Sequence, residues 1–171
     1  QYLYFFNGAG VGAGDFNRDG KTDLVFAANM SHPVLYVNET EGLGISFTDA
    51  TEAAGLKGIN GWSTGVSVAD VNADGWLDIF FCQVGGYKSF SGRNRLLINE
   101  MGRTGKLQFT DKTEEFGLSF EGFSTQAAFF DYDLDGDLDM YLLCHSVHEP
   151  DNYGKADIRL TRDTRAGDRL Y

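Results

Sequence analysis

One nine-residue pattern occurs three times in this chain of 171 residues and constrains its fold more than any other feature. Each copy has Asp or Asn at positions 1, 3, 5 and 9 and Gly at position 6, and an apolar run follows each copy. The copies span residues 15–23, 70–78 and 131–139, and are called here loops 1, 2 and 3. A pattern that recurs along a chain in this way predicts a repeat protein.

The similarity continues between the loops. Residues 47–56 and 109–118 are identical at seven of ten positions. Each unit also contains four short runs rich in Val, Ile, Phe and Tyr, which are typical of strands. In the second unit these runs are residues 65–69, 77–82, 95–98 and 107–110. Four strands per unit predict an all-β fold of β-propeller blades, with loops 1 to 3 between the first and second strands.

The repeats divide the chain into predicted units at residues 1–60, 61–121 and 122–171, the last of them incomplete. A propeller closes with roughly four to eight blades, so about three units predict a partial propeller or a piece of a longer one. Closure by association with other chains is the alternative. Within a unit, Asp49, Glu52 and Gly55 predict one capped helical turn, and residues 111, 114 and 117 repeat it.

The loops carry the chemistry of a calcium site. Ca²⁺ prefers oxygen ligands, and a glycine at position 6 permits the sharp turn that brings them together. Side chains at positions 1, 3, 5 and 9 and the carbonyl at position 7 would bind up to three ions, one per loop. The predicted ligands are Asp15, Asn17, Asp19, Lys21 and Asp23 in loop 1; Asp70, Asn72, Asp74, Trp76 and Asp78 in loop 2; and Asp131, Asp133, Asp135, Asp137 and Asp139 in loop 3.

Two alternatives compete with this interpretation. An EF-hand needs Glu at position 12 between two helices, whereas position 12 is Phe26, Phe81 or Leu142 and the flanks resemble strands. Turns without metal are the second alternative, because Asp, Asn and Gly are ordinary turn residues. Three loops with the same ligand spacing favour the metal sites, with a structural role that clamps two strands together.

The loops and their flanking strands resemble FG-GAP/VCBS repeats, the blades of integrin-α-like β-propellers. Segments such as residues 94–99 and 109–114 are similar to segments of bacterial surface proteins that carry ASPIC/UnbV-associated repeats. The resemblance implies an extracellular or cell-surface location, with the bacterial outer surface suspected, and a role in adhesion, ligand binding or assembly. It implies no catalytic site, so we expect no enzyme activity from this segment.

Composition limits the partners. The chain has 25 acidic and 14 basic residues, a formal net charge of −11, which argues against nucleic acid. No apolar run is long enough to span a membrane. We expect a protein or carbohydrate ligand, or other subunits of a surface assembly, on the rim away from the calcium loops. A carbohydrate-active enzyme or lectin on the same scaffold is the alternative, because a fold does not fix a function.

That rim carries the connections between second and third strands, which lengthen along the chain. The connection in the second unit, residues 83–94, holds Tyr87, Lys88, Phe90 and Arg93, and the third spans residues 145–168. Long loops on a rigid scaffold often carry function. Packing of Tyr87 and Phe90 onto neighbouring blades is the alternative. The recurrence of Ser-Thr at residues 63–64 and 124–125 predicts hydrogen bonds between blades rather than a nucleophile.

Overall fold

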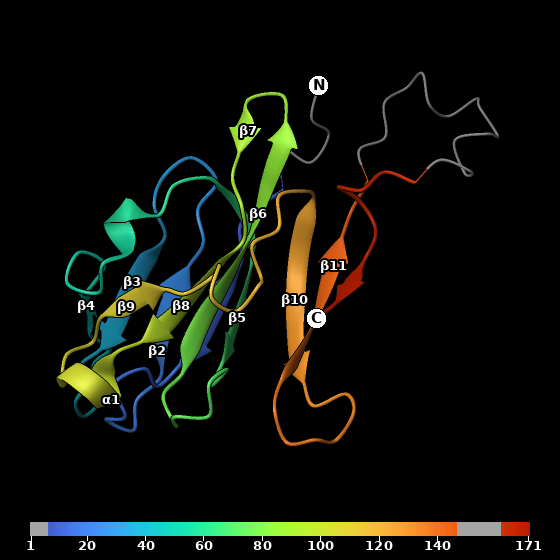
Figure 1. Cartoon of the computed structure of the whole chain (residues 1–171). Coiled ribbons are helices and arrows are strands. Elements are labelled where there is room, and N and C mark those ends of the chain that lie inside the picture. Colours follow the sequence, from blue (N-terminus) through green and yellow to red (C-terminus); the bar gives the residue numbers. More distant parts are fainter. Residues whose placement is uncertain (1–6, 147–161) are drawn as a thin grey trace.

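The computed structural model describes residues 7–146 and 162–171, and its strands form three antiparallel sheets (Figure 1). In the first and third sheets neighbouring strands follow one another in the sequence, and in the second sheet only the short β7 comes between the paired strands β6 and β8. The first sheet contains β1 (Val11–Gly14), β2 (Asp23–Phe26), β3 (Val34–Asn38) and β4 (Phe47–Asp49). The second contains β5 (Trp62–Ala69), β6 (Asp78–Tyr87), β8 (Arg95–Asn99) and β9 (Phe109–Asp111), with β7 (Phe90–Ser91) beside β6. The third contains β10 (Ser124–Phe130), β11 (Asp139–Cys144) and β12 (Arg169–Leu170).

Each loop joins the first two strands of its sheet in the same register. The last residue of the first strand pairs with position 9 of the loop, as Gly14 with Asp23, Ala69 with Asp78 and Phe130 with Asp139. The prediction of an all-β fold with four short strands in the first two units is therefore confirmed. The strands lie inside the three predicted units, whose end points stay a prediction.

Two local predictions were wrong. Residues 83–94 were expected to form a loop, but β6 continues to Tyr87 and pairs with β7, so most of this segment is a hairpin. The hairpin turns at Lys88 and Ser89, where Lys88 has a φ of 52°, and Gly86, with a φ of 65°, lies at an irregularity in the pairing of β6 with β7. A second error was the number of helical segments, because α1 (Met101–Thr104) also occurs, between β8 and β9, without an apolar pattern that would have predicted it.

The predicted helical turn at residues 49–55 has its caps but little helix. Asp49 accepts a hydrogen bond from the N–H of Thr51, at 2.9 Å, and Gly55 adopts a φ of 82°. A 3₁₀ segment, η2 (Leu56–Gly58), follows. No helix in the described residues has both the length and the apolar character needed to cross a membrane.

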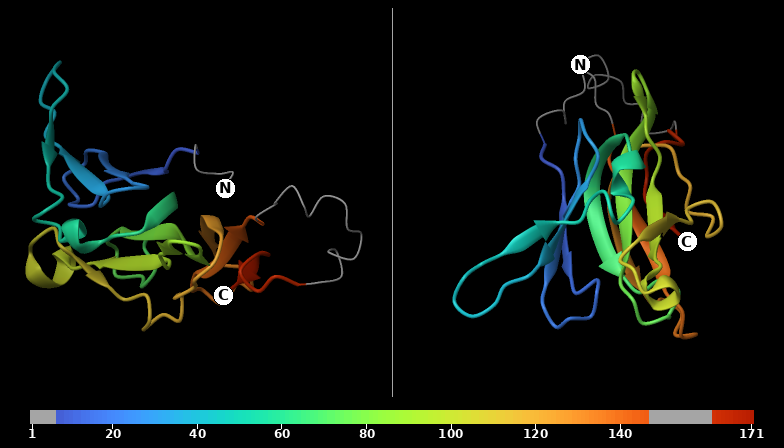
Figure 2. Two further views of the ribbon diagram at one scale, coloured as in Figure 1. Left: turned by 90° about the horizontal axis from the view of Figure 1, so that it is seen from above. Right: turned by 90° about the vertical axis from the view of Figure 1, so that its left-hand side faces the viewer.

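The three sheets lie side by side in chain order, as the view from above shows (Figure 2). One apolar core lies between the first and second sheets and another between the second and third. Strand β6 supplies both, because successive side chains of a strand point to opposite faces: Ile79 and Phe81 join the first core, and Phe80 and Cys82 the second. Cys144 packs against the second core, and both cysteines are free thiols.

The first strands of the three sheets lie next to one another. The N–H of Gly10 donates to the carbonyl of Thr64 at 2.5 Å, and the Thr64 hydroxyl donates to the carbonyl of Ser124 at 2.8 Å. A Cβ at Gly65 would lie 2.4 Å from the carbonyl oxygen of Thr125, so only glycine permits this approach. The predicted hydrogen bond between repeats is confirmed at Thr64.

Candidate metal centres

Loops 1 and 2 have the same internal hydrogen bonds. The carboxylate at position 1 accepts the N–H groups of positions 5 and 6: Asp15 accepts from Asp19 and Gly20 at 3.1 and 2.8 Å. In loop 2, Asp70 accepts from Asp74 and Gly75 at 3.1 and 2.7 Å. The N–H of position 7 donates to the carboxylate of position 5, from Lys21 at 2.9 Å and from Trp76 at 2.8 Å.

Position 3 is Asn in both of these loops and contributes in two ways. The side-chain oxygen of Asn72 accepts the N–H of Asp74 at 3.1 Å, and its amide donates to the Asp74 carboxylate at 3.0 Å. Asn17 makes the same two bonds to Asp19, at 3.1 and 3.3 Å. The amide therefore stabilises a carboxylate that would otherwise be held only by the N–H of position 7.

Position 9 is a buried aspartate whose oxygens both accept backbone N–H groups. Asp78 accepts from Val71 at 2.9 Å and from Asn99 at 2.9 Å, and Asp23 accepts from Phe16 at 3.0 Å and Asn38 at 2.8 Å. Burial of the carboxylate raises the pKa of Asp78 to about 6 and also raises the pKa of Asp23. In both aspartates, backbone hydrogen bonds from the loop and from the third strand partly offset this rise in pKa.

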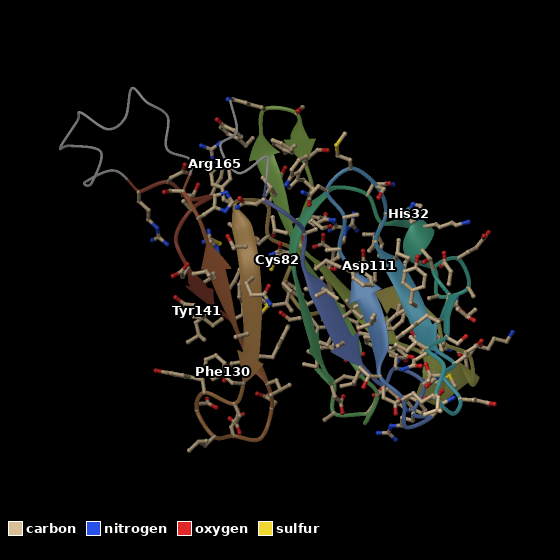
Figure 3. All side chains as sticks on the ribbon, turned by 180° about the vertical axis from the view of Figure 1, so that it is seen from behind. His32, Cys82, Asp111, Phe130, Tyr141 and Arg165 are labelled. Carbon is tan, nitrogen blue, oxygen red and sulfur yellow. The ribbon has the colours of Figure 1, made fainter. Side chains whose placement is uncertain are left out.

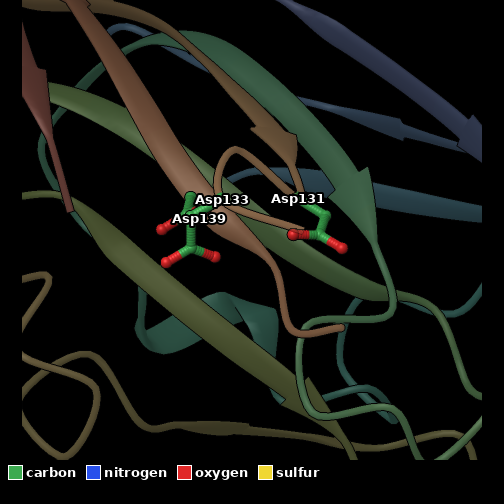
Figure 4. A group of neighbouring side chains, drawn as sticks. All are labelled: Asp131, Asp133 and Asp139. Atoms are coloured by element: carbon green, nitrogen blue, oxygen red, sulfur yellow. The ribbon is translucent and has the colours of Figure 1, made fainter. Parts of the chain in front are cut away.

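Loop 3 is arranged differently. Among the described residues, only here do three acidic side chains offer ligand atoms within 4.8 Å of one another, from Asp131, Asp133 and Asp139 (Figure 4). Asp131 accepts one N–H, from Gly136 at 3.2 Å, and its other oxygen, Oδ1, is buried without a hydrogen-bond partner. Asp139 accepts the N–H of Tyr132 at 2.8 Å.

The remaining acids of loop 3 repel one another. Asp135 accepts the N–H of Asp137 at 3.2 Å but lies outside the group of three. The neighbouring Asp135 carboxyl raises the pKa of Asp137, through a hydrogen bond and through its charge. This loop holds five carboxylates in nine residues, whereas loops 1 and 2 hold three each.

These observations fit a hard divalent cation. A buried carboxylate oxygen with no donor costs free energy, and a cation is the partner that satisfies it among oxygen ligands. Asp131, Asp133 and Asp139 are the residues that would hold the ion in loop 3. The predicted sites in loops 1 and 2 have the same oxygen types, with hydrogen bonds already made to the side chains.

Two residues that the sequence did not single out connect loop 1 to loop 2. Arg18 stacks over the Trp76 ring, 4.6 Å from its centroid, and its guanidinium donates to the Gly75 carbonyl. Asn99 donates from its side chain to the buried carbonyl of Phe16 at 2.9 Å, while its N–H binds Asp78. Contacts across 57 and 83 residues of sequence have no local signal that could have revealed them.

The rim opposite the loops was the predicted place for a partner. There Tyr87 packs edge-on against Phe123, with centroids 5.4 Å apart, and Phe90 packs against Trp62 at 5.1 Å. Arg93 forms an ion pair with Glu114. The alternative of packing onto a neighbouring blade is therefore confirmed for Tyr87, whereas Phe90 packs within its own unit. Of the third connection, residues 147–161 lie outside the described residues.

The fold and loops define an all-β repeat protein of antiparallel sheets with acidic hairpin turns. Within it, residues 15–81 match the family model of the FG-GAP-like repeat, which spans loops 1 and 2. The resemblance to this repeat is thus confirmed. A search of curated proteins gives no match. The likeness to ASPIC/UnbV-associated surface proteins stays a prediction.

Proposed function

We propose that this chain is a calcium-stabilised β-propeller-type module that binds a protein or glycan outside the cell. The observation that carries the proposal is the group of Asp131, Asp133 and Asp139, with one buried carboxylate oxygen that has no donor. The match to an FG-GAP-like repeat supports the propeller-type fold. Such repeats are typical of extracellular proteins, where calcium is plentiful.

A bound cation would supply positive charge between strands β10 and β11. Asp131 follows β10 and Asp139 begins β11, so ligands from both strands would be held together at one point. Without the cation these carboxylates repel one another across the turn. Extracellular calcium modules bind with dissociation constants of about 0.1–1 mM, which suits a structural role.

A binding role is proposed in preference to a catalytic one. A hollow of about 330 Å³ opens among the first strands of the three sheets, lined in part by Trp62, Thr64, Gln126 and His145. Its described lining contains amides, hydroxyls and an indole but no carboxylate, whereas glycoside hydrolysis uses a pair of carboxylates. Another hollow is lined by Asp111, Glu114 and Glu115, but each of these carboxylates forms an ion pair, with Arg95, Arg93 and Lys112 respectively.

Terbium luminescence tests calcium binding loop by loop, because Tb³⁺ replaces Ca²⁺ and emits when an aromatic side chain lies beside it. Tyr132 is position 2 of loop 3, and Trp76 is position 7 of loop 2. We expect saturable emission that calcium displaces and that Tyr132→Phe weakens without loss of binding. Asp131→Asn should remove the site in loop 3, whereas Asp70→Asn, at the same position of loop 2, should leave the emission sensitised by Tyr132 unchanged.

Thermal unfolding provides the second readout. Calcium at ten to a hundred times the dissociation constant should add about 1.4–2.7 kcal/mol of stability per site. Emission without saturation, or unfolding curves that coincide in calcium and in excess chelator, would contradict the proposal.

A further inference from the structure

Each of the three loops has an aspartate followed by a glycine at positions 5 and 6, and these are the only three Asp-Gly bonds in the chain. They are Asp19-Gly20, Asp74-Gly75 and Asp135-Gly136. An Asp-Gly bond isomerises more readily than other aspartyl bonds, because glycine has no side chain to hinder attack of its nitrogen on the carboxyl before it. Contacts that hold either group in place slow that attack. The hydrogen bonds of each loop therefore decide how fast its Asp-Gly bond reacts.

In loops 1 and 2 the carboxyl at position 5 is held by two donors. One oxygen of Asp74 accepts the N–H of Trp76 at 2.8 Å, and the other accepts the side-chain amide of Asn72 at 3.0 Å. Asp19 has the same two donors, from positions 7 and 3 of loop 1, at 2.9 and 3.3 Å. To react, the carboxyl carbon must turn toward the nitrogen of the next residue. In these two loops that rotation breaks both hydrogen bonds, and their loss slows the reaction.

In loop 3 the same carboxyl is held more weakly. Position 3 is Asp133, which has no amide to donate. Among the described contacts of this loop, Asp135 accepts one backbone N–H, from Asp137 at 3.2 Å. The Asp137 carboxyl beside it carries charge of the same sign. Of the three position 5 carboxyls, that of Asp135 is therefore the least restrained.

The attacking nitrogen is also held least in loop 3. The glycine N–H donates to the position 1 carboxylate at 2.8 Å from Gly20 and 2.7 Å from Gly75, but at 3.2 Å from Gly136. Arg18 lies against Gly75, whereas no described heavy atom beyond the chain neighbours lies within 4 Å of the Cβ position at Gly20 or Gly136. The contacts thus rank the bonds from loop 3, the most reactive, through loop 1 to loop 2.

The contrast lies inside the loops and not in their surroundings. Loop 3 projects from the third sheet just beyond Phe130, the last residue of β10, which Figure 3 labels. Asp135 and Gly136 are exposed there, but Asp19 and Gly20 are equally exposed although the second sheet packs against the first. A neighbouring sheet therefore does not cover positions 5 and 6, and the hydrogen bonds within each loop make the difference.

We propose that the Asp135-Gly136 bond of loop 3 is a site of spontaneous isomerisation to isoaspartate. The Gly136 nitrogen attacks Cγ of the neutral Asp135 carboxyl and forms a cyclic succinimide, while the N–H proton and the carboxyl hydroxyl leave together as water. Water then adds to the main-chain carbonyl of the ring and breaks its bond to nitrogen. The water lost in the first step is regained in the second, so the product has the composition of the starting chain.

Isoaspartate changes the path of the main chain, which now runs through the former side chain and is longer by a methylene. The carbonyl at position 7 is thereby displaced relative to the carboxylates at positions 1 and 3, so loop 3 loses its arrangement of oxygen ligands. The modification itself does not depend on calcium. Only its suppression by calcium rests on the function proposed above.

Peptide mapping of the whole chain, after weeks in excess chelator at neutral pH, tests the proposal. Isoaspartate keeps the mass of aspartate, so its peptic peptides are separated by chromatography and assigned by their fragment ions. The same incubation in urea gives the rate of each bond in the unfolded chain, and the ratio of the two rates removes differences of sequence. Folding should slow the reaction at Asp19 and Asp74 about tenfold more than at Asp135, the effect of one hydrogen bond to a charged group.

An exchange at position 3 provides matched variants, and circular dichroism checks the fold of each. Asp133→Asn supplies the missing amide and should slow the reaction at Asp135, whereas Asn72→Asp should speed the reaction at Asp74. Equal ratios of folded to unfolded rate in the three loops, or unchanged rates in both variants, would overturn the proposal. Added calcium should slow the reaction at Asp135. Fast reaction in chelator that calcium leaves unchanged would support the modification and contradict the calcium site.

Discussion

Loops 2 and 3 have the same spacing, the same register and the same place between two strands, yet only loop 2 satisfies its own carboxylates. In loop 2 the Asn72 amide donates to Asp74 and the third strand donates to Asp78. In loop 3 position 3 is Asp133, which adds a charge instead of a donor, and Asp131 keeps an oxygen without a partner. We therefore propose that the ligand spacing sets where a cation would bind, and that the residue at position 3 sets how much the loop would depend on it.

The largest effect should come from removing the connection between loops 1 and 2. Asn99→Ala leaves the buried carbonyl of Phe16 without its donor, so we expect a loss of about 2–3 kcal/mol of unfolding free energy. Asn38→Ala is the control, because the Asn38 amide donates to the Thr22 carbonyl at an exposed site, while its oxygen accepts the N–H of Thr40 as the Asn99 oxygen accepts that of Met101. Urea unfolding in excess chelator measures the stability of both variants. Equal losses would show that the buried Phe16 carbonyl contributes no more than the exposed Thr22 carbonyl.

The buried aspartate of loop 2 should make the metal-free protein sensitive to pH. Because burial raises the pKa of Asp78 from 3.8 to about 6, the folded state binds this proton more tightly than the unfolded state. The contribution to stability is present below about pH 4 and is lost as the pH rises through about 6, by up to about 3 kcal/mol.

Urea unfolding in chelator at a series of pH values checks this. Asp78→Asn should lower the stability at every pH, since an amide cannot accept both N–H bonds, but it should flatten this slope. Calcium should reverse the slope, because the ion binds the deprotonated carboxylates. A wild-type slope that Asp78→Asn leaves unchanged would assign the effect to another group.

An exchange at position 3 tests the cause of the contrast directly. Asp133→Asn gives loop 3 the amide of loops 1 and 2, and should raise its metal-free stability by about 1 kcal/mol while reducing the gain from calcium. The reciprocal Asn72→Asp should lower the metal-free stability and increase the calcium gain. Thermal unfolding with and without calcium gives both values, and changes of the same sign in the two variants would refute the role of position 3.

The smallest effect concerns the surface contact between the loops. Arg18→Ala removes the stacking over Trp76 and the bond to the Gly75 carbonyl, at an exposed site, and should cost about 0.5–1 kcal/mol. A double-mutant cycle with Trp76→Ala isolates the pair. A coupling energy of zero would show that the two loops are joined only through Asn99.

Local patterns predicted much of this structure, because the loops and strands depend on residues close together in the chain. The ligand spacing placed all three hairpins, and Val- and Phe-rich runs placed the strands of the second unit. The hairpin at residues 83–94 was missed because Gly85 and Gly86 resemble strand breakers. The backbone donors to the position 9 carboxylates were also missed, since Asn38 and Asn99 lie 15 and 21 residues from the aspartates they bind.

Hydrogen exchange of the loop amides tests the central claim most directly. Loops 1 and 2 hold the N–H groups of positions 5, 6 and 7 on their own side chains, so these amides should stay protected in excess chelator. In loop 3 the N–H groups of positions 6 and 7 bind side chains at 3.2 Å, longer than in loops 1 and 2, and no bond to the position 5 N–H occurs among the described contacts of this loop. Peptides that cover residues 131–139 should therefore exchange faster in chelator than those of loops 1 and 2, and should become protected when calcium is added. Equal protection of all three loops without calcium would contradict the account.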